Sequence, residues 1–265
     1  MRKRKKTISK NMIEVLDYHT SRTYRKNGKR VKKKSITPEA QKKQNEKQAE
    51  AMLRMLIDNN FTTNDCYITL TYKEQPATWE DAKKDIQNFT RRLNRRYKKL
   101  GKELKYIYIA EGKTRIHFHM IINNAELYSD EINELWTHGM HKLMLYQGRA
   151  EDAVRLASYF VKEKRSACYS DKEDAFKRRW NSSKNLEKPK VKTEILKPSE
   201  WREYIQPPKG YYVETDSVVE SVSEEGYPYR FYRLIRIEEG KHGTTRNRHC
   251  DRGNARSNNN GIMRN

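Results

Sequence analysis

The feature that most constrains the fold is an apolar run that contains two histidines spaced two residues apart, His117 and His119. Because successive side chains of a strand point to opposite faces, this spacing predicts a strand with both imidazoles on one face. A turn predicted at residues 112–115 would fold Glu111 back beside His117. Two imidazoles and one carboxylate on one sheet face are typical of a divalent-metal site. The opposite face of the same strand is apolar: Ile116, Phe118, Met120 and Ile122.

The charge of the chain indicates a polyanionic partner. Its 265 residues carry a net charge of +22, with 35% hydrophobic and 35% charged residues. A chain of this length and composition forms one or two domains and buries one core of moderate size. We therefore expect a phosphate near the metal and a nucleic acid as partner. The alternative is a generic basic surface, since the lysine-rich termini carry part of the excess charge.

The cysteines and the hydropathy indicate a cytoplasmic protein. The three cysteines, Cys66, Cys168 and Cys250, lie far apart and form no C-x-x-C pair, so neither a structural zinc site nor a disulfide framework is expected. No apolar run approaches the ~18 residues of a membrane span. The basic residues 1–6 precede no apolar segment of the kind that a secretory signal needs.

Four regions follow one another along the chain. Residues 1–36 are polar and basic, and we expect them to be largely disordered, with a strand or short helix near residues 12–18. Residues 37–60 are predicted to form a helix that begins at Thr37-Pro38-Glu39. Residues 61–238 carry the catalytic motifs, and residues 239–265 are predicted to be a disordered basic tail.

Within residues 61–238 the pattern alternates between strands and helices. The strand at 66–72 would place Thr69 and Thr71 on the histidine face if the two strands pair. The helix at 78–101 has an apolar stripe and an opposite cationic face, where Arg92 and Arg95 are candidates for DNA contact. The remaining elements are a hairpin at 106–123, a short helix at 129–136, a strand at 142–146, a helix at 148–164, and a second hairpin at 211–222 and 229–237.

The helix at 148–164 carries Tyr159 about 140° from the centre of its apolar stripe. Lys162 and Arg155 share the face of Tyr159, one helical turn away on either side. A phenol has a pKa of about 10 and is a poor nucleophile at neutral pH, and a nearby ammonium favours the phenolate. The alternative is an ordinary amphipathic tyrosine at the margin of the core.

Three blocks occur in a fixed order along the chain: the Thr-rich strand Tyr67–Tyr72, the strand His117-Phe-His119, and the helical Tyr159-Phe-Val-Lys162. In this order the blocks resemble the HUH endonuclease superfamily, and within it the rolling-circle replication initiators of small plasmids and single-stranded DNA phages. Glu111 and two further segments are also similar to that group, at residues 136–139 and 183–186.

The resemblance implies an α+β fold in which a central antiparallel sheet of about five strands is flanked by helices, in the RRM-like, split βαβ arrangement. It also implies Mg²⁺- or Mn²⁺-dependent nicking and joining of single-stranded DNA. His117, His119 and Glu111 would hold the metal, and Tyr159 would attack the scissile phosphate. The products would be a 5′-phosphotyrosine link and a 3′-OH that primes the host polymerase, while Lys162 would offset negative charge.

A second catalytic tyrosine, found in part of the superfamily about one turn further on, has no counterpart here. The corresponding positions are Lys162 and Glu163, and Tyr169 falls beyond the predicted helix. The chain also lacks a G-x-x-x-x-G-K-[ST] segment, so unwinding would depend on a host helicase. We therefore expect a single-tyrosine enzyme of plasmid or viral origin in the bacterial cytoplasm.

Other interpretations of the motifs stay open. The same chemistry serves single-tyrosine transposases and mobilisation relaxases. A non-enzymatic basic nucleic-acid-binding protein is a third class, in which the histidines and Glu111 would be ordinary surface residues. In each class we expect DNA contacts from cationic side chains at five positions: Arg92, Arg95, Arg115, Arg155 and Lys184.

Overall fold

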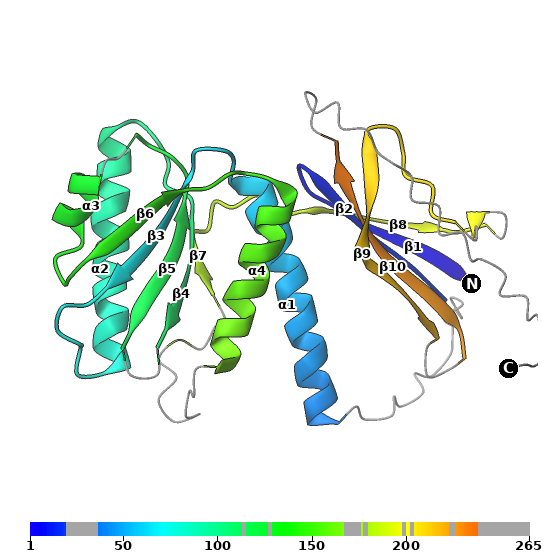
Figure 1. Ribbon diagram of the computed structural model, residues 1–265, viewed down its shortest axis with the longest axis horizontal. Coiled ribbons are helices and arrows are strands. Elements are labelled where there is room, and N and C mark those ends of the chain that lie inside the picture. Colours follow the sequence, from blue (N-terminus) through cyan, green and yellow to red (C-terminus); the bar gives the residue numbers. More distant parts are fainter. Residues whose placement is uncertain are drawn as a thin grey trace, which may run out of the picture.

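The computed structural model has four layers (Figure 1). A pair of helices, a five-stranded sheet, a second pair of helices and a second five-stranded sheet follow one another, and both sheets are antiparallel. This arrangement confirms the predicted α+β class with a sheet flanked by helices. The structure describes residues 1–19, 37–112, 115–126, 129–166, 176, 180–197, 200–201, 204–222 and 226–237.

The central sheet contains the histidine strand in its middle. Its strand order is β6-β3-β5-β4-β7. Thr69 lies opposite His119 and Thr71 opposite His117, so the predicted register between these strands is confirmed. The bounds of the strands are β3 (Cys66–Thr71), β4 (Tyr106–Glu111), β5 (His117–Ile122), β6 (His141–Leu145) and β7 (Asn181–Ser182).

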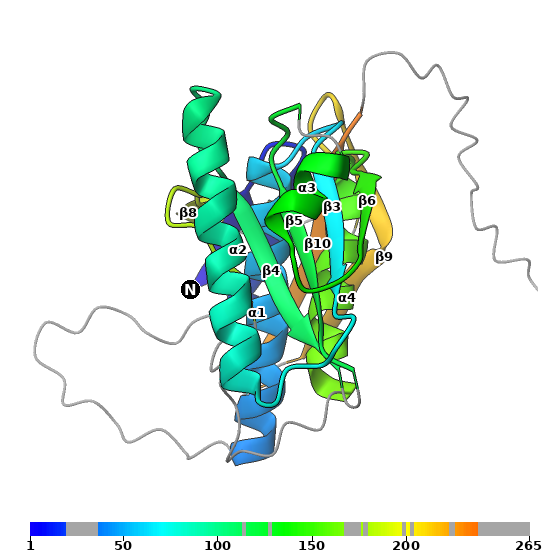
Figure 2. The same ribbon diagram turned by 90° about the vertical axis from the view of Figure 1, so that its left-hand side faces the viewer.

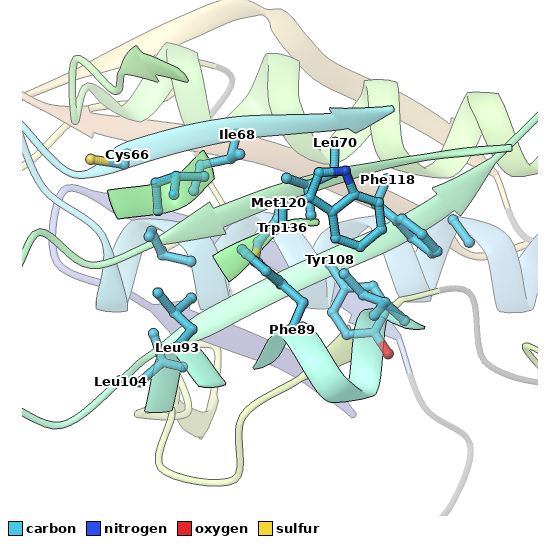
Figure 3. Packing of buried hydrophobic residues seen from close by; sticks show 14 of the residues in the cluster. Cys66, Ile68, Leu70, Phe89, Leu93, Leu104, Tyr108, Phe118, Met120 and Trp136 are labelled. Carbon is cyan, nitrogen blue, oxygen red and sulfur yellow. The ribbon is translucent and has the colours of Figure 1, made fainter. Parts of the chain in front are cut away.

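Helices α2 (Trp79–Lys99) and α3 (Ser129–Leu135) cover one face of the central sheet (Figure 2). The hydroxyl of Thr78 accepts a hydrogen bond from the Asp81 amide at 3.1 Å and caps α2, as the sequence predicts. The core on this side forms because alternate strand residues meet the apolar stripe of the helix (Figure 3). Its largest members include Ile68, Leu70, Phe89, Phe118 and Trp136.

Helices α1 (Pro38–Asn60) and α4 (Ala150–Ser166) cover the other face of the central sheet. The apolar residues that α1 buries, among them Leu53 and Ile57, lie in its C-terminal half, as expected from its polar first half. Met12 and Ile235 of the second sheet join the same apolar cluster. The two helices are therefore shared, with one sheet on each side (Figure 1).

The second sheet has the strand order β8-β1-β2-β10-β9. The predicted hairpin at 211–222 and 229–237 is confirmed by β9 and β10, which pair antiparallel. The bounds are β1 (Arg2–Ile8), β2 (Met12–His19), β8 (Lys190–Ile195), β9 (Tyr211–Val222) and β10 (Pro228–Arg236).

The expectation of disorder in residues 1–36 is wrong for β1 and β2. The run of cations in β1 is typical of a solvated segment, but its backbone bonds to β2 on one side and to the distant β8 on the other. Arg4 pairs with Asp17 at 2.7 Å and Lys6 with Glu194 at 2.6 Å, which offsets part of the repulsion. Residues 20–36 and the predicted tail at 239–265 lie outside the described residues.

Buried polar contacts tie α1 to the second sheet. Arg54 donates from Nε to Glu14 Oε1 at 2.8 Å, and both side chains are less than one-tenth exposed. Asp58 accepts from the Ser9 hydroxyl at 2.5 Å and from the Asn11 amide at 2.8 Å. The predicted division of the chain at residue 60 stays a prediction, and β2 and β10, from either side of it, share one sheet.

In the part of the chain that the structure describes, no helix is long and apolar enough to cross a membrane.

Candidate active site

The hairpin of β4 and β5 brings Glu111 beside the two histidines. Glu111 lies directly opposite His117 in the register, and His119 lies two residues further along β5 on the same face. Opposed residues of an antiparallel pair have α-carbons about 4.5–5.5 Å apart, so their side chains meet. The hairpin turns sharply at Gly112, whose φ is 134° and where a β-carbon would lie 2.0 Å from the Arg115 carbonyl oxygen. Only glycine fits this position.

These three side chains could hold one metal ion. One ligand atom from each of Glu111, His117 and His119 lies within 4.8 Å of the others. Glu111 Oε2 is 3.0 Å from His119 Nε2 and 3.4 Å from His117 Nε2. Neighbouring ligands of an octahedral ion, at about 2.1 Å from it, are about 3.0 Å apart, so the spacing suits Mg²⁺ or Mn²⁺. Mixed imidazole and carboxylate ligation favours Mn²⁺.

Helix α4 directs Tyr159 at this cluster. Ala153, Ala157 and Phe160 bury the apolar stripe of the helix against the sheet and α1. The Tyr159 hydroxyl lies 3.1 Å from Glu111 Oε2, to which it donates, and 3.0 Å from His119 Nε2. A tyrosine at the edge of the helical stripe therefore places its oxygen beside atoms that could bind the metal.

The hydrogen bonds of the imidazole Nδ1 atoms fix how the histidines face the cluster. His117 Nδ1 lies 3.0 Å from the Arg115 carbonyl oxygen, which can only accept, so this nitrogen carries the proton. His119 Nδ1 lies 2.8 Å from the Tyr67 hydroxyl and 3.2 Å from the Thr69 hydroxyl. Both rings thus present Nε2 toward Glu111, which is the arrangement found in metal-binding histidines.

Sequence reasoning missed Tyr67 as a partner of His119. Burial first, and then the charge of Glu111, raise the pKa of Tyr67 well above its ordinary value, so Tyr67 stays a neutral phenol. The signal was present in the strand pattern, because Tyr67 and Thr69 share parity and His119 is the partner of Thr69. A residue one step along the same face of β3 can reach the same imidazole.

The cationic residues predicted to bind DNA fall in different places. Arg115 lies two residues before His117 and donates to the Tyr72 carbonyl oxygen at 3.2 Å. Arg155 lies one turn before Tyr159 in α4 and pairs with Asp152 at 2.5 Å. Lys162 lies one turn after Tyr159 in α4, and its side chain is outside the described part of the structure.

The other three predicted DNA contacts are not brought to this site. Arg92 and Arg95 are exposed on α2, which covers the opposite face of the central sheet. Lys184 follows β7, which pairs with the Tyr106 end of β4, five residues and therefore about 17 Å from Glu111. If these residues contact DNA, they do so away from the tyrosine.

Comparison with known proteins gives one family match. Residues 65–164 match a family of replication-associated proteins that is described by the name ORF2, and this segment runs from β3 to α4. The match spans less than half of the chain but includes Glu111, His117, His119 and Tyr159. The segment that carries the candidate site is therefore similar to replication-associated proteins.

A search of solved structures finds the crystal structure of the hypothetical protein ORF119 from Sulfolobus islandicus rod-shaped virus 1. The two sequences are 18% identical, the match covers 44% of this chain and 96% of that one, and the TM-score is 0.33. No curated protein matches the chain.

Proposed function

We propose that the protein nicks and rejoins single-stranded DNA to initiate rolling-circle replication, with Tyr159 as the nucleophile. The observation that carries the proposal is the position of the Tyr159 hydroxyl, 3.0 Å from His119 Nε2 and 3.1 Å from Glu111 Oε2. A phenol oxygen beside two histidines and a carboxylate combines a nucleophile with a metal-binding set, and this combination serves phosphoryl transfer.

His117, His119 and Glu111 would hold Mg²⁺ or Mn²⁺, and the bound ion would polarise the scissile phosphate as a Lewis acid. Glu111 is 17% exposed and His119 10%, so the carboxylate charge is only partly screened by water. The hydrogen bonds from Tyr67 and Arg115 would hold the two rings in the orientation that binding needs.

In the nicking step the Tyr159 oxygen attacks phosphorus in line with the 3′ oxygen of the preceding nucleotide. The new bond joins tyrosine to the 5′ phosphate, the bond from phosphorus to the 3′ oxygen breaks, and the 3′ oxygen takes up a proton. Glu111 Oε2 accepts the hydrogen bond of the phenol and is placed to receive its proton. Attack by a 3′-OH on the phosphotyrosine reverses the step, so rejoining needs no ATP.

Lys162 follows Tyr159 by three residues in α4 and so lies on the same helical face. We propose that its ammonium offsets charge on the phenolate or the phosphate. The net charge of +22 would hold the DNA through phosphate contacts, with host helicase and polymerase acting on the freed 3′ end. The match of residues 65–164 to replication-associated proteins favours this use over transposition or plasmid mobilisation.

The test is a nicking assay on single-stranded DNA that covers the gene and its flanking sequence, labelled at the 5′ end. We expect one major cut with Mn²⁺ and none with EDTA, and a 5′ fragment that a DNA polymerase can extend. A 5′ fragment ending in phosphate, or cleavage that persists in EDTA, would contradict the proposed chemistry.

A further inference from the structure

A pocket of about 820 Å³ opens beside the candidate site, where β3 ends. Its wall is formed by Thr71, Tyr72 and Lys73 at the end of β3, by Arg115, and by residues 137–141 between α3 and β6. Ligand-binding pockets typically have volumes of about 300–1,000 Å³, so this one is large enough for an organic ligand.

The pocket and the candidate site share a wall. Thr71, which lines the pocket, lies opposite His117 in the register of β3 and β5. Arg115, also in the lining, accepts the His117 Nδ1 hydrogen bond at its carbonyl oxygen. A DNA strand whose phosphate reaches Tyr159 would therefore pass this pocket with a neighbouring nucleotide.

The loop at residues 137–140 is held rigidly against the end of β3. The Thr71 amide donates to the Met140 carbonyl oxygen at 2.8 Å, and the Lys73 amide donates to the His138 carbonyl oxygen at 2.9 Å. A β-carbon on Gly139 would lie 2.4 Å from the Thr71 carbonyl oxygen, so only glycine lets the loop lie this close to the strand. The wall is thus formed before any ligand binds, which lowers the entropic cost of binding.

His138 forms an aromatic platform on this wall. Its ring centroid lies 5.0 Å from that of Trp136 and 5.8 Å from that of Tyr72, and Nε2 lies 3.5 Å from Asp85 Oδ1. The side chain is still 35% exposed. Met140 beside it is 77% exposed, which is unusual for a large apolar side chain and fits a surface that a flat ring covers.

The charges in the pocket suit an anion. Lys73 and Arg115 contribute cations, and no carboxylate is present in the lining formed by described residues. Burial lowers the pKa of His141 below its ordinary value, so this ring is a neutral hydrogen-bonding group at pH 7. Aromatic, apolar and cationic groups together are the set that single-stranded nucleic acids require.

We propose that this pocket binds one nucleotide of the single-stranded substrate next to the scissile phosphate, with the base stacked on His138 and Met140. Arg115 and Lys73 would contact the adjoining phosphate. The proposal rests on the proposed function for its substrate class, but it concerns binding and needs neither the nucleophile nor the metal.

The test measures binding of fluorescein-labelled oligo-dT of ten nucleotides by anisotropy in EDTA, with every variant made in a Tyr159→Phe parent. Loss of a stacked base costs about 1–3 kcal/mol, so His138→Ala should weaken binding about tenfold. The slope of log affinity against log salt should stay the same, because no phosphate contact is lost. His138→Phe should bind within about twofold of the parent, since phenylalanine keeps the stacking surface.

Arg115→Ala should lower that salt slope by about 0.7, the value for one phosphate contact on a single strand. The matched control is Lys98→Ala, which removes an exposed cation from the last turn of α2 on the far side of the sheet and should leave the affinity unchanged. Each variant is first shown to unfold at the parent temperature within a few degrees.

Three results would overturn the pocket: His138→Ala binding as the parent does, His138→Phe binding as poorly as His138→Ala, or no measurable binding of oligo-dT by the parent. A wild-type chain that binds oligo-dT as expected but forms no covalent adduct would contradict the proposed nicking function and leave the pocket standing.

Discussion

Replacing Tyr67 by phenylalanine should weaken metal binding without touching any proposed ligand. The change removes one oxygen, which lies 2.8 Å from His119 Nδ1, while the ring keeps its place in the strand. Groups that orient metal-binding histidines typically contribute 10–100-fold to metal affinity or activity. Thr69 also reaches this nitrogen, at 3.2 Å, so it can take over part of the interaction. We therefore expect the lower end of the range, about tenfold, equivalent to about 1.4 kcal/mol.

Mn²⁺ affinity is best measured from the paramagnetic resonance signal of the free ion at fixed protein concentration. Thr69→Val alone should have a smaller effect than Tyr67→Phe, and the double variant should approach 100-fold, because no hydroxyl then holds Nδ1. Tyr106→Phe is the control, since Tyr106 is a half-buried tyrosine of the same sheet on its opposite face. Unchanged Mn²⁺ affinity in the double variant would refute the assignment of His119 Nε2 as a ligand.

Three further substitutions test other parts of the structure. Glu111→Gln should weaken Mn²⁺ binding in the same resonance assay while single-stranded DNA affinity stays within about twofold, because only a hard carboxylate ligand is lost; an unchanged titration would exclude Glu111 as a ligand. His117→Ala and His119→Ala should both abolish metal-dependent cleavage, but in denaturant unfolding only the buried His119 should cost about 1–3 kcal/mol, since its loss leaves the Tyr67 hydroxyl without its partner; equal stabilities would contradict that account. Arg54→Ala should lower the free energy of unfolding by about 3–5 kcal/mol, because it strands a buried carboxylate, and a loss below about 1 kcal/mol would show that the pair does not join α1 to the second sheet.

The parts of the fold that follow from local periodicity were predictable. The alternation around His117 and His119 and the stripe of α2 each depend on neighbours within a few residues. The cap at Thr78 and the start of α1 at Pro38 depend on single positions. The approach of Glu111 to His117 also follows, because a short turn fixes the register of a hairpin.

The parts that depend on distant pairing were not predictable from the pattern. β1 is a run of cations whose strand character comes from β2 and from β8, and a single-sequence pattern contains no sign of β8. The cationic face of α2 looked suited to DNA, but its position depends on which sheet face the helix covers. Arg92 and Arg95 therefore could not be assigned to or excluded from the site by sequence alone.

The most direct test of the central claim is the identity of the residue that becomes linked to DNA. The protein is incubated with Mn²⁺ and the single-stranded DNA that it nicks, the covalent adduct is digested with nuclease and protease, and the modified peptide is sequenced by mass spectrometry. The account predicts one modified residue, Tyr159 carrying a 5′-phosphonucleotide, and no adduct from Tyr159→Phe. An adduct on any other residue, such as Tyr169, or an adduct that survives in Tyr159→Phe, would contradict it.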